Sequence, residues 1–388
     1  MRTIALLLSI AAVCAAQEDL QERAFVMDGH VHLISRTLLQ GTDIGKRAPD
    51  GHVDLPRLRE GGVNAIFFSV YTPEPYYPAR YEVKNTFRVV EAALDQIEKN
   101  KDQVALALNA SDLERIAAAG KIGAFLDLEG AFDLDGDLRI LRALYRLGLR
   151  SAQLTAHNYT NNFADSCCDV PKWGGLNAHG REVILEMNRL GMVINVAHGS
   201  DETILQTVEQ SEDPVIYTHG GFRHFVDITR LISDEAARAI AAKGGVIGLQ
   251  FGNGFHNPKY FKWRFNAPFV LNISTKLEQY AGMSIEQIDV EEKKGLPFMT
   301  KPGSVPEEYH MSVDQLASVI DYGVKLVGED HISLGSDFDG GPLLPREMKD
   351  ASDYGEIIKA LRRLGYGEER IKKIVGGNLL RVIRVVTE

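Results

Sequence analysis

Basic patches, long apolar runs and paired cysteines are missing from most of this sequence. Its 388 residues include 43 Lys and Arg against 53 Asp and Glu, a formal net charge of −10, and no basic stripe is visible. We therefore expect no nucleic-acid partner, because binding to phosphates needs clustered positive charge. An acidic balance of this size favours solubility and says nothing about the substrate.

Beyond residue 16, no apolar run approaches the roughly 20 residues that a membrane-spanning helix needs. The chain begins MRTIALLLSIAAVCAAQED, in which one Arg precedes a short apolar run, small residues and then charge. This pattern predicts a signal peptide over residues 1–16, with cleavage near Ala15 or Ala16. We therefore expect a secreted or periplasmic protein without a stable membrane span. A buried N-terminal helix is the alternative reading of the same residues.

Only three cysteines occur, and Cys14 lies in the predicted signal peptide. Cys167 and Cys168 are adjacent and lack CxxC spacing, so the sequence does not predict a zinc knuckle. Two alternatives stay open for this pair in an oxidising compartment: a vicinal disulfide, or two free, half-buried thiols.

Short apolar runs alternate with helical patterns along the whole chain, without repeats or a linker. Helical patterns cover 138–147, 178–190, 202–210, 234–242, 354–364 and 368–375. Eight strand-then-helix units predict a (β/α)₈ TIM barrel, and residues 17–388 form its single domain. A doubly wound sheet fits less well, because no glycine-rich turn follows the first strand. The predicted strands are Phe25–His32, Asn64–Val70, Ile122–Glu129, Arg150–His157, Val193–His198, Val215–His219, Val246–Gln250 and Ile332–Asp337.

About eighty residues, Phe251 to His331, separate the seventh and eighth predicted strands. Connections this long in a compact domain usually serve a function or carry helices of their own. We expect an insertion that acts as a lid over the barrel mouth or as a subunit contact. A surface excursion without a function is the alternative.

Seven side chains suited to metal binding or proton transfer end six of the predicted strands. In TIM barrels the chemistry lies at the carboxyl ends of the strands, so all seven are expected on one face. Each alone is a weak signal, since a single His at a strand end is usually a hydrogen-bonded core residue. The seven are His30, His32, Glu129, His157, His198, His219 and Asp337.

Spacing along the strands divides these residues between two cations. His30 and His32 are two apart and point the same way from a strand, so both can bind one ion. His198 and His219 lie on neighbouring strands and can bind a second ion. Imidazole and carboxylate ligands together suit Zn²⁺, with Mn²⁺ or Co²⁺ as substitutes.

The remaining acidic and histidine candidates receive supporting roles. Asp28 and Asp127 share the strand parity of the ligands and are expected to orient them. Backbone hydrogen bonding is an equally good explanation for both. The other histidines are expected to be structural or surface residues: His52, His179, His224, His256, His310 and His331.

Eight segments in order make the chain resemble the renal or membrane dipeptidase family of zinc peptidases. They span residues 27–382 and read MDGHVH, LDLEGAF, QLTAHNYTNNFAD, INVAHGS, PVIYTHGG, DITRLISDE, HISLGSDFDGG and VGGNLLRV. The resemblance implies two zinc ions, the first bound by His30 and the residue at 32, and the second by His198 and His219. It also implies that Glu129 bridges both ions.

The resemblance assigns the remaining roles as well. His157 contacts the scissile carbonyl or its oxyanion, Arg230 pairs with the substrate carboxylate, and Asp337 handles the protons. The implied activity is hydrolysis of dipeptides by a metal-activated hydroxide, including dipeptides with a D-residue at the C-terminal position. A homodimer is compatible with this architecture.

His32 departs from the family pattern, which usually has Asp at this position in an HxD motif. The exchange removes a negative charge from the first metal site, which puts metal occupancy and substrate range in question. The chain also lacks the disulfides of human-type members. A lactonase, N-acyl-amino-acid hydrolase or deaminase on the same site is the first rival function, and a catalytically silent binding protein is the second.

Overall fold

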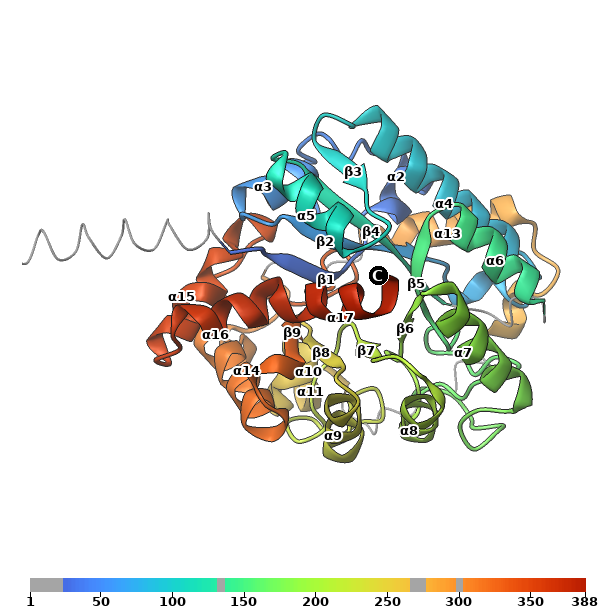
Figure 1. Cartoon of the computed structure of the whole chain (residues 1–388). Coiled ribbons are helices and arrows are strands. Elements are labelled where there is room, and N and C mark those ends of the chain that lie inside the picture. The colour runs from blue at the N-terminus through green and yellow to red at the C-terminus, as the bar shows by residue number, and fades with distance from the viewer. Residues whose placement is uncertain (1–23, 131–136, 266–276, 298–302) are drawn as a thin grey trace, which may run out of the picture.

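A parallel β-sheet curls into a barrel at the centre of the molecule (Figure 1). The computed structural model describes residues 24–130, 137–265, 277–297 and 303–388, so the predicted signal peptide lies outside the described residues. A short extra strand, β3 (Val104–Leu106), pairs with β4 (Ile122–Glu129) and lies outside the ring of the other strands. The eight strands around the barrel are β1 (Met27–Val31), β2 (Ala65–Tyr71), β4 (Ile122–Glu129), β5 (Leu149–Gln153), β6 (Val193–Asn195), β7 (Ile216–Tyr217), β8 (Val246–Leu249) and β9 (Ile332–Leu334).

Backbone contacts between the first and last strands close the barrel. The amide of His32 donates to the carbonyl of Phe338 at 2.9 Å, and the amide of Asp337 donates to that of His30 at 2.9 Å. Val31 and Phe338 form an isolated parallel bridge. The predicted TIM barrel is therefore confirmed.

Helices surround the barrel, and polar side chains fix where several of them begin (Figure 1). Ser200, Ser233 and Asn177 accept from backbone amides at the starts of α8, α9 and α7, which satisfies donors that the helix leaves free. The surrounding helices are α2 (Ile34–Gln40), α3 (Leu55–Glu60), α4 (Glu82–Lys99), α5 (Ala110–Ala118), α6 (Leu138–Arg146), α7 (Ala178–Leu190), α8 (Asp201–Gln210), α9 (Asp234–Ala242), α14 (Val313–Val327), α15 (Gly355–Arg363) and α16 (Glu368–Lys372).

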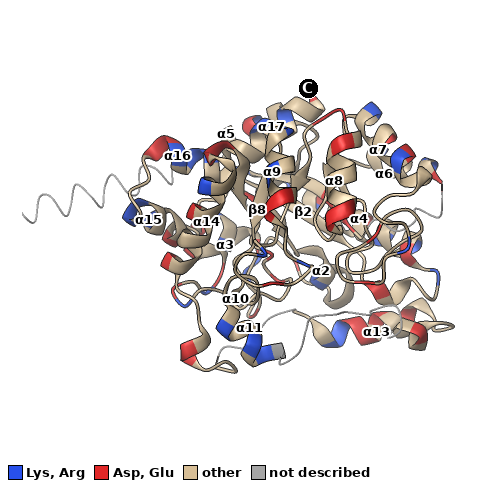
Figure 2. Cartoon of the chain, turned by 90° about the horizontal axis from the view of Figure 1, so that it is seen from below, with Lys and Arg blue, Asp and Glu red and all other residues tan. Residues whose placement is uncertain are grey.

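Helix α17 (Asn378–Thr387) covers the amino ends of the strands. Its buried Leu379 and Ile383 join an apolar cluster with Met27, Phe67 and Phe125 from the sheet. Figure 2 shows α17 at one end of the molecule and three helices at the other: α10 (Asn253–His256), α11 (Pro258–Phe265) and α13 (Ile285–Gly295). One end of the barrel is thus sealed by apolar packing, which leaves the carboxyl ends of the strands for the site.

The connection between β8 and β9 carries several helices within its described residues. They are α10 (Asn253–His256), α11 (Pro258–Phe265), α13 (Ile285–Gly295) and α14, with three-residue 3₁₀ turns between them. Asp289 of α13 accepts hydrogen bonds from Tyr76 at 2.6 Å and from Arg88 at 2.6 Å, which ties this helix to the segment after β2. The role of the whole connection, as a lid over the barrel mouth or as a subunit contact, stays a prediction.

Several predicted boundaries were wrong. The strand predicted to end at His157 stops at Gln153, and those predicted to end at His198, His219 and Asp337 stop two or three residues early. The chain there leaves the sheet ladder and turns over the barrel mouth. The helix predicted over 368–375 is present as α16 followed by a π-helix (Lys373–Gly377), and the chain kinks at Gly376 before α17 begins.

Candidate metal centre

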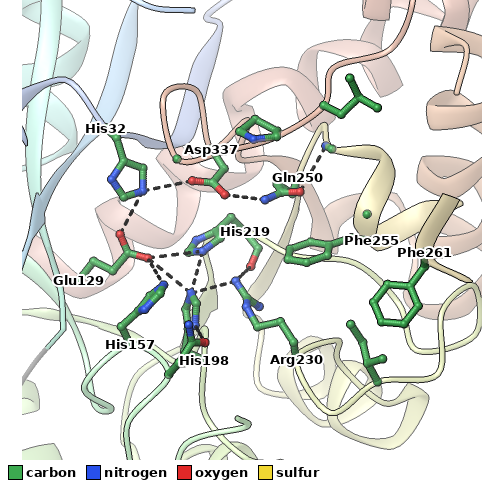
Figure 3. A pocket seen from close by; sticks show the side chains of 18 of the residues that line it. His32, Glu129, His157, His198, His219, Arg230, Gln250, Phe255, Phe261 and Asp337 are labelled. Carbon is green, nitrogen blue, oxygen red and sulfur yellow. Dashed lines mark hydrogen bonds and ion pairs between the residues drawn. The ribbon is translucent and has the colours of Figure 1, made fainter. Parts of the chain in front are cut away.

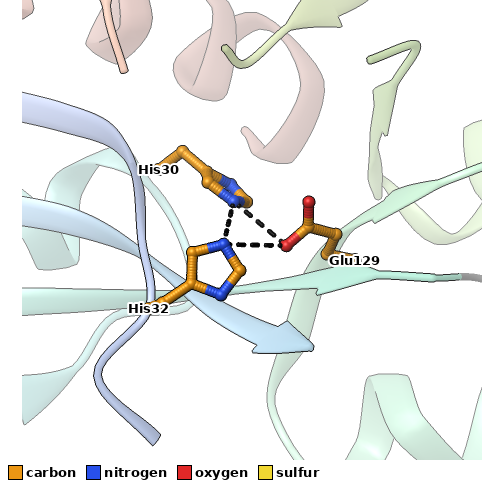
Figure 4. Close-up of side chains that lie close together, drawn as sticks. All are labelled: His30, His32 and Glu129. Atoms are coloured by element: carbon orange, nitrogen blue, oxygen red, sulfur yellow. Dashed lines mark hydrogen bonds and ion pairs between the residues drawn. The ribbon is translucent and has the colours of Figure 1, made fainter. Parts of the chain in front are cut away.

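The first cluster of ligand atoms consists of His30, His32 and Glu129 (Figure 4). The Nε2 atoms of the two histidines lie 3.1 Å apart. Glu129 Oε2 lies 3.1 Å from His30 Nε2 and 3.2 Å from His32 Nε2. All three residues are buried, so the three atoms converge on one enclosed point.

The second cluster uses the other oxygen of the same carboxylate. Glu129 Oε1 lies 3.4 Å from His198 Nε2 and 3.7 Å from His219 Nε2. The two histidine Nε2 atoms lie 3.1 Å apart (Figure 3). His157 also approaches, with Nε2 3.8 Å from Oε1. Glu129 therefore stands between two histidine pairs and presents one oxygen to each.

The donor chemistry of both clusters fits a divalent cation. Donors about 2.0–2.2 Å from a tetrahedral ion lie about 3.3–3.6 Å from one another, close to the separations found here. Burial alone would raise the pKa of Glu129, but His30 and His32 hold it well below its ordinary value. Burial and nearby positive charge hold the pKa values of His198 and His219 well below theirs. An ionised carboxylate and neutral imidazoles are the forms that bind metals, so these directions favour a cation at the second cluster. At the first cluster burial lowers the pKa of His30 but the charge of Glu129 raises it, to about 9, so a cation bound there must displace a proton from this ring.

Neighbouring polar groups hold the candidate ligands in place. Ser69 donates to Glu129 Oε2 at 3.1 Å, and Thr218 Oγ1 lies 3.1 Å from His219 Nδ1. Asp127 lies 3.9 Å from His30 Nδ1, on the side facing away from the cluster. Asp28 accepts from the backbone amide of His30 rather than from its ring, so it supports the strand end.

Glu74 is the buried partner of His157, and sequence reasoning missed it. Its Oε1 lies 2.5 Å from His157 Nδ1 and accepts from the amide of Asn158 at 3.2 Å. Burial opposes protonation of His157, but contact with Glu74 raises its pKa. The ring is thus fixed with Nε2 directed towards Glu129.

Asp337 lies at the edge of the first cluster, with Oδ1 3.1 Å from His32 Nε2. Gln250, the residue after β8, donates to its other carboxylate oxygen (Figure 3). The prediction singled out Asp337 but not Gln250. His32 thus stands within contact of both Glu129 and Asp337.

Arg230 is buried beside the second cluster, with 4% of its surface exposed. Nη1 donates to Tyr217 Oη at 2.8 Å, and Nη2 lies 3.0 Å from His198 Nε2. Among the described residues no carboxylate pairs with Arg230, whereas Asp234 contacts Tyr322 and Arg238. Arg230 Nη2 therefore contacts the same His198 nitrogen that faces Glu129 and His219.

Left-handed backbone conformations gather at the site. The φ angles of His157, His198 and Asp337 are 56°, 64° and 60°, and that of Asp339 is 61°. In the described chain, only one other non-glycine residue, Arg80, has a positive φ. Such conformations cost energy and concentrate where a side chain must be aimed for function.

The remaining histidines join neither cluster. His52 and His256 are buried, and His256 Nε2 lies 2.6 Å from the carbonyl oxygen of Gln250.

The adjacent cysteines Cys167 and Cys168 form a vicinal disulfide, the first of the two alternatives that the sequence left open. The amide of Cys167 donates to the carbonyl of His198 at 2.8 Å, so this loop supports the second cluster from behind.

A cavity of about 560 Å³ opens over both clusters (Figure 3). Four histidines, Glu129, Asp337 and Arg230 line its floor, and an apolar wall includes Ile228, Phe255 and Phe261. The four histidines are His32, His157, His198 and His219. Cavities of this size hold small molecules, with a few polar groups that fix orientation. None of the described helices is long and apolar enough to cross a membrane.

Comparison with known proteins agrees with this architecture. The chain is 27% identical over 346 residues to dipeptidase tcpJ of Claviceps purpurea, covering 87% of this chain and 70% of that one. The structure of the probable dipeptidase PvdM from Pseudomonas aeruginosa superposes with a TM-score of 0.79 at 24% identity, covering 97% of this chain and 99% of that one.

A Rhodobacter sphaeroides metallopeptidase liganded with a phosphinate mimic of L-Ala-D-Ala gives a TM-score of 0.74 at 20% identity, covering 94% of this chain and 99% of that one. These two structural likenesses establish the fold. Residues 14–388 match the family described as membrane dipeptidase, peptidase family M19, and the chain belongs to this family of metallopeptidases.

Proposed function

We propose that this chain is a dipeptidase that works with two divalent cations, zinc in the first instance. The observation that carries the proposal is Glu129, which stands between two histidine pairs with Arg230 beside the second pair. The first ion would be held by His30, His32 and Glu129, and the second by Glu129, His198 and His219. When bound, such ions supply Lewis acidity and a nucleophile at neutral pH.

The chain's own residues divide the rest of the reaction among them. Arg230 binds the C-terminal carboxylate of the dipeptide, which places the scissile bond over Glu129 and limits substrate length. His157, fixed by Glu74, donates from Nε2 to the carbonyl oxygen as negative charge develops there. Asp337, oriented by Gln250, accepts a proton from the attacking water and passes it to the leaving amine.

Substrate stereochemistry and localisation belong to the same proposal. The mimic of L-Ala-D-Ala bound by the Rhodobacter sphaeroides peptidase supports substrates with a D-residue at the C-terminal position. The signal-peptide pattern of residues 1–16 supports secretion or a periplasmic location. A homodimer remains compatible with the fold.

A lactonase or N-acyl-amino-acid hydrolase on the same two-ion site is the rival function. Arg230 separates a dipeptidase from a lactonase, because a lactone offers no carboxylate for a buried guanidinium. The test compares a free dipeptide with its C-terminal amide in wild type and in Arg230→Met, with metal content measured for both. We expect about two ions per chain and a roughly hundredfold or greater preference for the free acid in wild type.

Arg230→Met should lose most of this preference and keep its metal. Equal preference in both proteins would assign the carboxylate to another cation. Equal hydrolysis of acid and amide by wild type, or a metal-free protein after growth with zinc, would contradict the dipeptidase assignment.

A further inference from the structure

The wall of the cavity beside Arg230 is apolar, in contrast to its floor (Figure 3). Ile228 lies two residues before Arg230 and packs with Val226 and Leu231 in a small buried cluster. Phe255 and Phe261 pack against this cluster and are only partly buried. Their rings therefore present apolar surface to the cavity.

This wall is held in place by hydrogen bonds outside the cavity. Phe255 lies on α10, where Asn253 donates to the carbonyl of Tyr309 at 2.6 Å and accepts from the amide of Met311 at 3.1 Å. The guanidinium carbon of Arg230 lies 5.2 Å from the centre of the Phe255 ring. Arg230 and the wall thus form one preorganised surface.

Covalent geometry decides which part of a dipeptide meets this surface. The α-carbon of the C-terminal residue is bonded both to the carboxylate and to the nitrogen of the scissile bond. With the carboxylate on Arg230 and the scissile bond over Glu129, that side chain must leave the backbone next to Arg230. The N-terminal residue lies on the other side of Glu129, towards His32 and Asp337.

We propose that Ile228, Phe255 and Phe261 form the subsite for the side chain of the C-terminal residue, and that they select a bulky apolar or aromatic one. This inference rests on the proposed function and adds a substrate class to it. Covering a large apolar side chain removes surface from water on both partners, whereas glycine leaves the wall exposed. The opposing feature is Arg264, an exposed cation on α11 that also lines the cavity and would favour an acidic side chain.

The test measures kcat/KM of the metal-loaded protein for Ala-Phe, Ala-Leu, Ala-Gly and Ala-Glu, each chiral C-terminal residue in both L and D forms. Phe-Ala and Leu-Ala serve as reversed controls. We expect Ala-Phe or Ala-Leu, in the accepted stereochemistry, to exceed Ala-Gly by roughly tenfold to a hundredfold. Moving the bulky residue to the N-terminal position should not reproduce the gain.

Variants then assign the preference to the wall. Phe261→Ala and, as an independent second change, Ile228→Ala should each lower the Ala-Phe to Ala-Gly ratio about tenfold. Trp263→Ala is the matched control, because Trp263 lies on the same helix as Phe261, is 39% exposed and stacks on Tyr309 outside the cavity. The control should keep the wild-type ratio.

Dipeptide hydrolysis without a preference for bulky C-terminal residues would overturn this inference and leave the proposed function standing. A preference for Ala-Glu, or a ratio unchanged in both wall variants, would also overturn it. Absence of hydrolysis for every dipeptide would overturn the proposed function and this inference together.

Discussion

His157, His198 and Asp337 hold backbone conformations that only glycine adopts without strain. Each such residue costs on the order of 1 kcal/mol relative to an ordinary conformation. The surrounding fold must offset this cost, and it does so with contacts such as the Cys167 amide on the carbonyl of His198. The strain places these three side chains over the barrel mouth, where strands alone would not direct them.

His256 links the pH dependence of stability to the neighbourhood of the site. Burial lowers its pKa from 6.5 to about 4, and its Nε2 contacts the carbonyl of Gln250. Because the folded pKa is depressed, the stabilising contribution is complete above pH 6.5 and is lost as pH falls towards 4. Between pH 7 and pH 5 this group should cost the protein about 2 kcal/mol of unfolding free energy.

We therefore expect the unfolding free energy of His256→Gln to fall by about 2 kcal/mol less than that of wild type between pH 7 and pH 5. Urea unfolding at the two pH values measures this difference. The matched control is His224→Gln, at an exposed position, which should follow wild type. Parallel pH curves for wild type and His256→Gln would show that His256 does not stay neutral in the folded protein.

The gathering of His30, His32, Glu129, His198 and His219 at one end of the barrel could be predicted from the strand ends, but the side chains that contact them could not. His30, Glu129 and His219 end apolar runs, and this pattern is visible without a structure. Glu74 lies in the segment PEPYY, which indicates only a turn, and nothing local connects it to His157, which is 83 residues away. Long-range contacts of this kind depend on the closed barrel and leave no trace in local spacing.

At the scale of elements, the loop that follows β9 depends on a buried charge pair. Asp339 accepts from Arg36 of α2 at 3.3 Å and from the amide of His52 at 2.5 Å. Arg36 and Asp339 are 4% and 2% exposed, and Arg36 also pairs with Asp50. Because Asp337 lies two residues earlier, this contact fixes the loop that carries a proposed catalytic group.

We expect Arg36→Met to destabilise the protein by about 3 kcal/mol, because it leaves the carboxylate of Asp339 buried without its cation. The double variant Arg36→Met/Asp339→Asn should recover part of that loss. Denaturant unfolding measures the stability cycle, and kcat for a dipeptide reports the position of Asp337. If the double variant is no more stable than Arg36→Met alone, the two side chains are not coupled.

Boundaries of elements were harder to predict than their existence. The apolar run before His198 continues past β6, because Val196 and Ala197 stay buried after the ladder ends at Asn195. These two residues stay buried although strand pairing has ended, and a sequence pattern indicates burial but not pairing. The prediction omitted α17 because the chain kinks at Gly376, where a Cβ would lie 2.2 Å from the carbonyl oxygen of Phe25.

For the whole molecule, the apolar cluster between α17 and the amino ends of the strands should contribute substantially to stability. Ile383 of α17 is fully buried against the amino ends of the strands, whereas Val385 on the same helix is 54% exposed. We expect Ile383→Ala to cost about 2–5 kcal/mol of unfolding free energy, the range for large-to-small changes in a core. Val385→Ala should stay within about 0.5 kcal/mol of wild type. Equal losses of unfolding free energy for the two variants in chemical denaturation would mean that α17 does not stabilise the protein through this apolar cluster.

The position of α17 also sets an order of events during synthesis on the ribosome. Met27, Phe67 and Phe125 emerge early, yet the helix that covers them begins only at Asn378. Until that helix arrives, every partly made barrel carries an open apolar underside, the kind of surface that draws nascent chains into aggregates. The growing chain therefore exposes this apolar surface from the synthesis of β1 until that of α17, and a holding chaperone would find its binding surface on the side away from the two histidine clusters.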